Sequence, residues 1–224
     1  MESAYRNIGY FLLALPVIFV AGFWIPYLSE IPHFDSSITV PVHFHALLLF
    51  SWIVLLVIQP LAIRRGAFNL HRILGRISYM LMPLIVISAV AMVHKEYHEN
   101  LANGMGLVAA LAAEFLSVSQ LVLLAIFYCS AIVHIKRHEV AAHMRYMICI
   151  ALVLLPAGLA RILGYWFDFK QSLSQTCCLA VIDLCLIGLI WFDRKRHMAA
   201  RPYIQALAAY IVIEASWFAI GRPT

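Results

Sequence analysis

Seven long apolar stretches, separated by short polar segments, account for most of the chain. Each approaches or exceeds the roughly 18–20 residues that an α-helix needs to cross the hydrocarbon core of a bilayer. The pattern predicts an all-α fold, with one transmembrane domain over residues 1–224 that forms a bundle of seven membrane-spanning helices. The predicted spans cover approximately residues 8–27, 40–62, 71–93, 105–133, 143–166, 174–192 and 203–220.

The composition excludes a sizeable soluble domain. Apolar residues make up 64% of the 224 residues and charged residues 12%, whereas soluble domains average about 45–50% and about 25%. Seven spans of roughly 21 residues use about 150 positions, which leaves only short loops. The chemistry of this protein is therefore expected inside the bilayer or at its two surfaces.

The distribution of basic residues predicts the orientation. Loops rich in Lys and Arg stay on the cytoplasmic side of a membrane, and 12 of the 16 such residues fall on the side that includes the N-terminus. We expect a cytoplasmic N-terminus and an external C-terminus, in the inner (cytoplasmic) membrane of a cell. The net charge of +5 then reflects topology and attraction to anionic lipid head groups at the inner face, and no nucleic-acid partner is expected.

Two inner loops share a pattern that places histidines at matched depth. A pair of basic residues precedes His71 at the start of span three, and another pair precedes His143 at the start of span five. These histidines are predicted to lie near the cytoplasmic surface, facing one another. The alternative is that each is only a polar residue at a helix start. The candidate inner site consists of His71, His143, Gln59, Arg72, Arg76 and Arg145.

The inner site has the side chains that haem b requires. Two neutral imidazoles from neighbouring helices supply its axial ligands, and arginines suit its propionates. Gly75, one turn after His71, leaves room for a flat macrocycle. The sequence therefore predicts haem b at this site.

Residues in spans two to five form a signature: the string from His71 to Tyr79 (HRILGRISY), preceded by His45 and Gln59 and followed by His143-Met144-Arg145 and Arg161. This signature resembles a family of small bacterial multi-pass membrane proteins described as a domain of unknown function. The resemblance implies a histidine-bearing membrane protein that handles haem or a metal. This chain has Met144 where the family usually has arginine.

Ionisable groups inside the predicted spans are functional candidates, because a charge at the bilayer centre costs about 2.5–3.5 kcal/mol. Glu114, Asp183 and Glu214 share a single intramembrane cation, Arg161. At most one or two of the carboxyls can be paired with it. These four residues form a candidate proton or ion path. The alternative for each carboxyl is a protonated group that donates to a backbone carbonyl.

A second candidate site lies nearer the outer surface. His45 falls inside span two, where it is an alternative haem ligand with a partner near the outer surface. Together with His94 and Glu114 it is also a candidate metal site. The alternative for His94, at the end of a span, is a solvated residue.

Three functions are compatible with the sequence. The first is binding of haem b or a metal ion, in redox or quinone chemistry or in cofactor handling. The second is proton- or ion-coupled transport, and the third is a non-catalytic subunit or assembly factor of a membrane complex. The sequence has no phosphate-binding loop, no His-Glu-x-x-His pair and no Gly-x-Ser-x-Gly elbow, and it leaves enzyme activity open. The expected partners are lipid and either a quinone or another membrane protein.

Overall fold

The structure is a computed structural model that describes residues 2–33 and 38–220. These residues form helices and connecting turns, with no strand. The elements are η1 (Ser3–Tyr5), α1 (Ile8–Phe11), α2 (Ala14–Trp24), η2 (Leu28–Glu30), α3 (Val40–Arg64), α4 (Phe68–Ala102), α5 (Leu107–Lys136), α6 (Val140–Phe167), α7 (Gln171–Lys195) and α8 (Arg201–Ile220), where η marks a 3₁₀ helix.

Seven segments of the described chain are long and apolar enough to cross a membrane. The prediction of an all-α fold with seven segments long and apolar enough to span a membrane is thereby confirmed. Six of the segments are the single helices α3 to α8, and the first is the Ser3–Trp24 segment, which combines η1, α1 and α2.

The first span was predicted over residues 8–27, with a kink caused by Pro16. The helix is interrupted at Leu12 and Leu13, between α1 and α2. The cause is Pro16, which has no N–H to donate to the Leu12 carbonyl and whose ring clashes with that carbonyl.

The helix α4 continues well past the predicted span end at residue 93, to Ala102. The added segment is polar, and within it Lys95 and Glu99 form an ion pair of 2.7 Å at i,i+4 spacing. Such pairs support exposed helices, so the helix extends beyond the apolar stretch that hydropathy detects.

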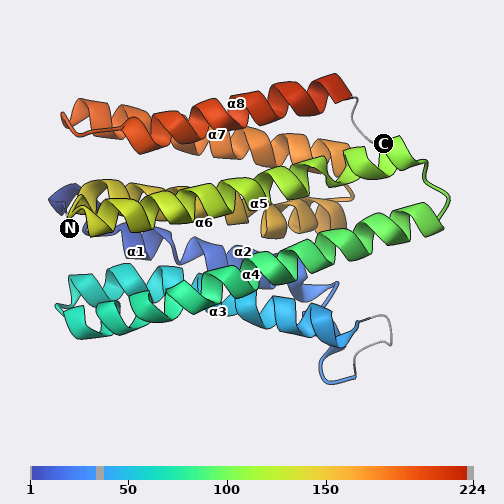
Figure 1. Ribbon diagram of the computed structural model, residues 1–224, viewed down its shortest axis with the longest axis horizontal. Coiled ribbons are helices and arrows are strands. Elements are labelled where there is room, and N and C mark those ends of the chain that lie inside the picture. The colour runs from blue at the N-terminus through green and yellow to red at the C-terminus, as the bar shows by residue number, and fades with distance from the viewer. Residues whose placement is uncertain (1, 34–37, 221–224) are drawn as a thin grey trace.

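The helix α6 lies at the centre of the bundle. In Figure 1, α5 and α6 lie between the α7–α8 pair and the α3–α4 pair, and η1 and the end of α8 lie at opposite ends. The helix α6 packs against α2, α5, α7 and α8. In the most apolar part of α6, 50% of the residues are buried inside the bundle, whereas in the most apolar part of α4 the share is 22%.

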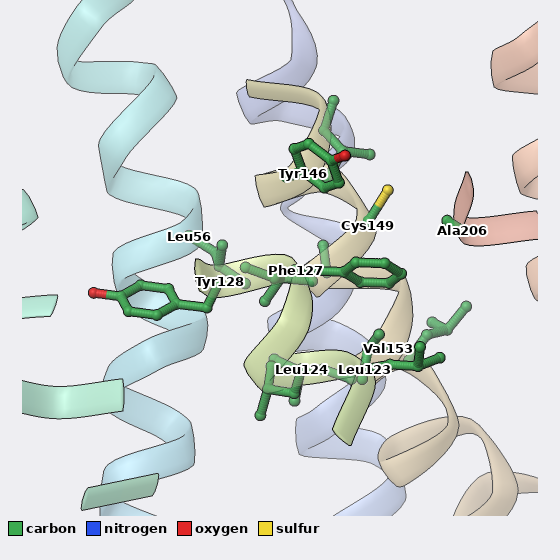
Figure 2. Close-up of a cluster of buried hydrophobic side chains, with 14 of the residues drawn as sticks. Leu56, Leu123, Leu124, Phe127, Tyr128, Tyr146, Cys149, Val153 and Ala206 are labelled. Atoms are coloured by element: carbon green, nitrogen blue, oxygen red, sulfur yellow. The ribbon is translucent and has the colours of Figure 1, made fainter. Parts of the chain in front are cut away.

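The core joins α3, α5, α6 and α8. Figure 2 shows Phe127 of α5 among apolar side chains, while the next residue, Tyr128, extends to the other side. The rings of Trp52 and Tyr128 meet edge to face, with centroids 5.7 Å apart. Labelled members of this cluster are Leu56, Leu123, Leu124, Phe127, Tyr128, Tyr146, Cys149, Val153 and Ala206.

Two glycines let α2 and α6 approach backbone to backbone. A Cβ atom added to Gly22 would lie 2.9 Å from the carbonyl carbon of Gly158 and nearer still to its oxygen. A Cβ atom on Gly158 would lie 3.0 Å from the carbonyl oxygen of Ile18. Small residues at such crossings are typical of packed membrane helices.

A buried ion pair joins α6, α7 and the N-terminal segment. The Nε of Arg145 donates to Oδ2 of Asp193 at 2.6 Å, and a second guanidinium nitrogen lies 2.8 Å from a Glu2 carboxylate oxygen. Tyr5 donates to the other Asp193 oxygen at 2.6 Å. The side chains of Arg145 and Asp193 are 1% and 0% exposed, so water does not compete for the contact between these two residues.

Candidate functional site

A cavity of about 540 Å³ opens among α1, α3, α4, α5 and α6. This inner cavity lies at the end of the bundle where α4 and α6 begin. Its lining is mostly apolar. Five of the six residues predicted for the inner site line it: Gln59, His71, Arg72, Arg76 and His143.

The two histidines reach the cavity from equivalent positions. His71 is the fourth residue of α4, and His143 is the fourth residue of α6. The backbone N–H of His71 donates to the carbonyl of Ala67, and the backbone N–H of His143 donates to the carbonyl of Glu139. Each carbonyl belongs to the residue just before the helix begins. The equal position within each helix explains why two similar loop patterns bring the two imidazoles to one cavity.

His71 is held by the carboxamide of Gln59 on α3. With the amide nitrogen turned toward the ring, Gln59 donates to Nδ1 of His71, and its oxygen accepts from the Gly75 N–H at 3.0 Å. The Gln59 side chain therefore satisfies the ring and the α4 backbone together. When Nδ1 accepts, the neutral imidazole carries its proton on Nε2.

His143 has the opposite arrangement. Its Nδ1 lies 2.9 Å from the carbonyl oxygen of Ala131 on α5. A carbonyl can only accept, so Nδ1 carries the proton and Nε2 keeps a free lone pair. The inner cavity thus has one imidazole with a free donor and one with a free acceptor, and a molecule that contacts both must offer complementary groups.

A hydroxyl pair completes the polar lining. Ser78 of α4 donates to the Gly75 carbonyl at 2.7 Å, so the Tyr128 hydroxyl, 3.0 Å away, donates to Ser78. Both side chains line the inner cavity. This contact aligns α5 with the turn of α4 that follows His71.

The arginines of the inner site separate into two groups. Arg72 and Arg76 line the cavity and are exposed. Arg145 is engaged in its ion pair with Asp193 and Glu2. Only Arg72 and Arg76 are thus free to meet an anionic group of a ligand, and Arg145 stabilises the fold around the cavity.

The residues of the predicted metal site do not gather. His94 lies 3.1 Å from His98 through their Nε2 atoms, and Glu114 accepts from Asn100 at 3.2 Å. His45 instead pairs with Ser88 of α4 at 2.9 Å. Across residues 2–33 and 38–220, no three His, Cys, Asp or Glu side chains are placed to hold a metal ion.

The Ser88 contact fixes the role of His45. Ser88 gives its own proton to the Ile85 carbonyl at 2.9 Å. The Nδ1 of His45 must therefore donate to Ser88, which leaves Nε2 as an acceptor. Arg161 of α6 is close enough to His45 of α3 for electrostatic interaction.

The four residues of the predicted ion path interact with different partners and do not form one connected group. The carboxyl groups of Asp183 on α7 and Glu214 on α8 lie close enough to interact with one another, and one buried oxygen of each has no hydrogen-bond partner among the described residues. Glu114 is bonded to Asn100, and Arg161 donates to the Ala157 carbonyl at 2.7 Å and lies over the Phe23 ring at 4.4 Å. No ion pair links Arg161 to a carboxyl within the described chain.

Several partners of these groups were not predicted from the sequence. Asp193 falls just past the apolar stretch of span six, where an acidic residue normally meets water, and Glu2 lies before span one. Ser88, Tyr128 and Asn100 have no sequence signal, because contacts between helices depend on packing that one-dimensional patterns do not contain.

Comparison of the chain with protein-family models, with characterised proteins and with solved structures gives no match. Its functional assignment therefore depends on the residues themselves.

Proposed function

We propose that this chain binds a flat, largely apolar redox cofactor in its inner cavity, and that the cofactor is haem b. The observation that carries the proposal is the pair His71 and His143, the fourth residues of α4 and α6, which line one cavity of about 540 Å³. Ligand sites of roughly 300–1,000 Å³ with an apolar lining and a few convergent polar groups are typical of cofactor binding.

The residues present fit haem b, with His143 as the first ligand. Its Nδ1 is held by the Ala131 carbonyl, the arrangement that orients a metal-binding imidazole and leaves Nε2 to the metal. Arg72 and Arg76 are the partners for the propionates. Bound there, haem b supplies a one-electron redox centre inside the membrane.

His71 becomes a second ligand only if Gln59 turns its carboxamide over. The Gln59 oxygen then accepts the proton of Nδ1, and Nε2 of His71 is freed. Gln59 therefore decides between one and two histidine ligands, which the spin state of the iron reports.

The first prediction concerns light absorption. Protein purified from haem-supplemented cells should have a Soret band, and H143A should lose most of it because the fixed ligand is gone. H98A, on the exposed part of α4, is the matched control and should keep it. Q59E, which can only accept from His71, should raise the low-spin fraction. A colourless wild-type preparation would end the haem proposal.

A second candidate ligand is a quinone, and the Gln59–His71 contact favours it. A quinone carbonyl accepts from Nε2–H of His71, and the hydroxyl of the reduced form donates to Nε2 of His143. Neither contact needs Gln59 to move, in contrast to two-histidine ligation.

Binding of a short-chain quinone, in its oxidised and in its reduced form, to the purified protein tests this candidate. H71A should weaken binding of the oxidised form, and H143A binding of the reduced form, each about 3- to 10-fold, the loss of one neutral hydrogen bond. Titration of colourless protein in detergent measures the dissociation constant. Equal affinity in wild type and in both variants rejects the quinone, whether or not haem binds.

We further propose that the protein lies in the cytoplasmic membrane with its N-terminus inside, and that the basic inner face binds anionic head groups. The support is the excess of 12 of 16 Lys and Arg residues at one end. A fluorescent protein fused after Thr224 should stay dark if the C-terminus is external, and a periplasmic phosphatase fused there should be active. A bright C-terminal fusion contradicts this orientation.

A further inference from the structure

Asp183 and Glu214 lie half-buried at the contact between α7 and α8, and neither lines the inner cavity. Asp183 comes 12 residues after Gln171 and 12 residues before Lys195, the two ends of α7. At 1.5 Å per residue it is about 18 Å from each end, so the pair lies near the middle of the membrane-spanning segment.

The contact between these two carboxyl groups requires a proton. They lie within hydrogen-bonding reach of one another, and ionised carboxylates have acceptor atoms only. One buried oxygen of each group, Oδ1 of Asp183 and Oε1 of Glu214, has no hydrogen-bond partner among the described residues. A proton on one of the two carboxyls supplies the donor that this contact lacks.

No cation neutralises the pair within the described residues. Neither carboxyl forms an ion pair. Arg145 on the neighbouring α6 is held by Asp193 and Glu2. On α5, which also packs against α8, Glu114 is bonded to Asn100. Two ionised carboxylates at this depth would repel one another strongly, and one shared proton removes that repulsion.

Tyr210 provides an independent indication of a binding site. It lies one turn before Glu214 on α8, its side chain is 1% exposed, and its hydroxyl has no hydrogen-bond partner in the described chain. The hydroxyl is close enough to interact electrostatically with both carboxyls and with Cys149 of α6. Buried hydroxyls are normally hydrogen-bonded, so this unpartnered phenol marks a polar site that the described side chains leave unsatisfied.

We propose that Asp183 and Glu214 form a proton-binding site in the middle of the membrane, where two carboxyl groups share one proton beside the Tyr210 hydroxyl. Release of that proton leaves two carboxylates, and its uptake restores the hydrogen-bonded pair. Because the site is built on α7 and α8, it goes beyond the cofactor proposal, and either proposal can fail without the other.

Infrared spectroscopy of the full-length protein in lipid vesicles tests the site. The spectrum of wild type minus that of D183N/E214Q should contain the carbonyl-stretch band of one protonated carboxyl group per chain. The band should shift on exchange into D₂O and disappear as the pH is raised. If the double variant does not fold, the wild-type spectrum at neutral pH minus that at alkaline pH gives the band, because exposed carboxyls are ionised at both.

Two single variants sharpen the test. Y210F should keep the band and shift its frequency, because the phenol borders the shared proton. E114Q, which removes a carboxyl bonded to Asn100 on other helices, should leave the D183N/E214Q difference band unchanged. Absence of the band near neutral pH overturns the proposal. A band with the area of two protonated carboxyl groups that persists at every pH also overturns it. Loss of the band on adding Na⁺ at constant pH would identify a metal cation as the ligand and overturn it too.

Discussion

Replacing Asp193 by alanine is expected to lower the free energy of unfolding by about 3–5 kcal/mol, the loss typical of a buried ion pair deprived of one partner. Arg145 would remain with 1% of its side chain exposed and without its closest counter-charge. Tyr5, whose hydroxyl donates to Asp193, would lose its acceptor in the same step. The two losses act together because one carboxylate serves both groups.

The midpoint of unfolding in a detergent mixture measures this change. E99A is the matched control, since the Lys95–Glu99 pair is exposed and pairs of that kind contribute about 0–1 kcal/mol. The double variant R145M/D193L should be more stable than either single variant, because no unpaired charge is left buried. Equal unfolding midpoints for D193A and E99A would contradict the proposed role of the buried pair.

The substitution G22A is expected to destabilise the bundle by about 1–3 kcal/mol, the usual cost of overpacking. The new methyl group would meet the Gly158 backbone, with its carbonyl carbon at 2.9 Å. Backbone atoms cannot rotate away as a side chain does, so α2 and α6 must separate. The same unfolding measurement reports the loss.

The control for this substitution is G188A in α7. Nothing lies within 4 Å of a Cβ atom added to Gly188, and alanine is the better helix former by about 0.8–1.0 kcal/mol. G188A should therefore be neutral or slightly stabilising. If G22A and G188A change the stability equally, the effect of G22A comes from helix propensity and not from the close approach of α2 and α6.

The matched depth of His71 and His143 could be predicted because it depends only on local features. Each histidine follows a basic turn and lies in the first turn of the next helix, so its position along the membrane normal follows from sequence spacing. The role of Arg145 could not be predicted in this way. Its partner Asp193 is 48 residues away, and only helix packing brings the two together.

For the carboxyl groups within the spans, too, one feature could be predicted from the sequence and another could not. Their presence within spans six and seven could be read from hydropathy, and it marked Asp183 and Glu214 as unusual. Hydropathy does not report how a helix is rotated about its axis, so it could not distinguish these two neighbouring carboxyls from Glu114, which accepts a hydrogen bond from Asn100. The break at Pro16 is an intermediate case, because the residue predicts a distortion and the structure gives its position.

By itself the sequence determined that this protein is a bundle of seven apolar helices, because the length of an apolar stretch is a local property that bilayer thickness makes decisive. It also determined which polar groups would be costly to leave unpaired in lipid. The tertiary structure alone decided the pairing. The tautomers of His71 and His143 are set by Gln59 and by the Ala131 carbonyl, groups on other helices whose approach depends on how side chains interlock in three dimensions.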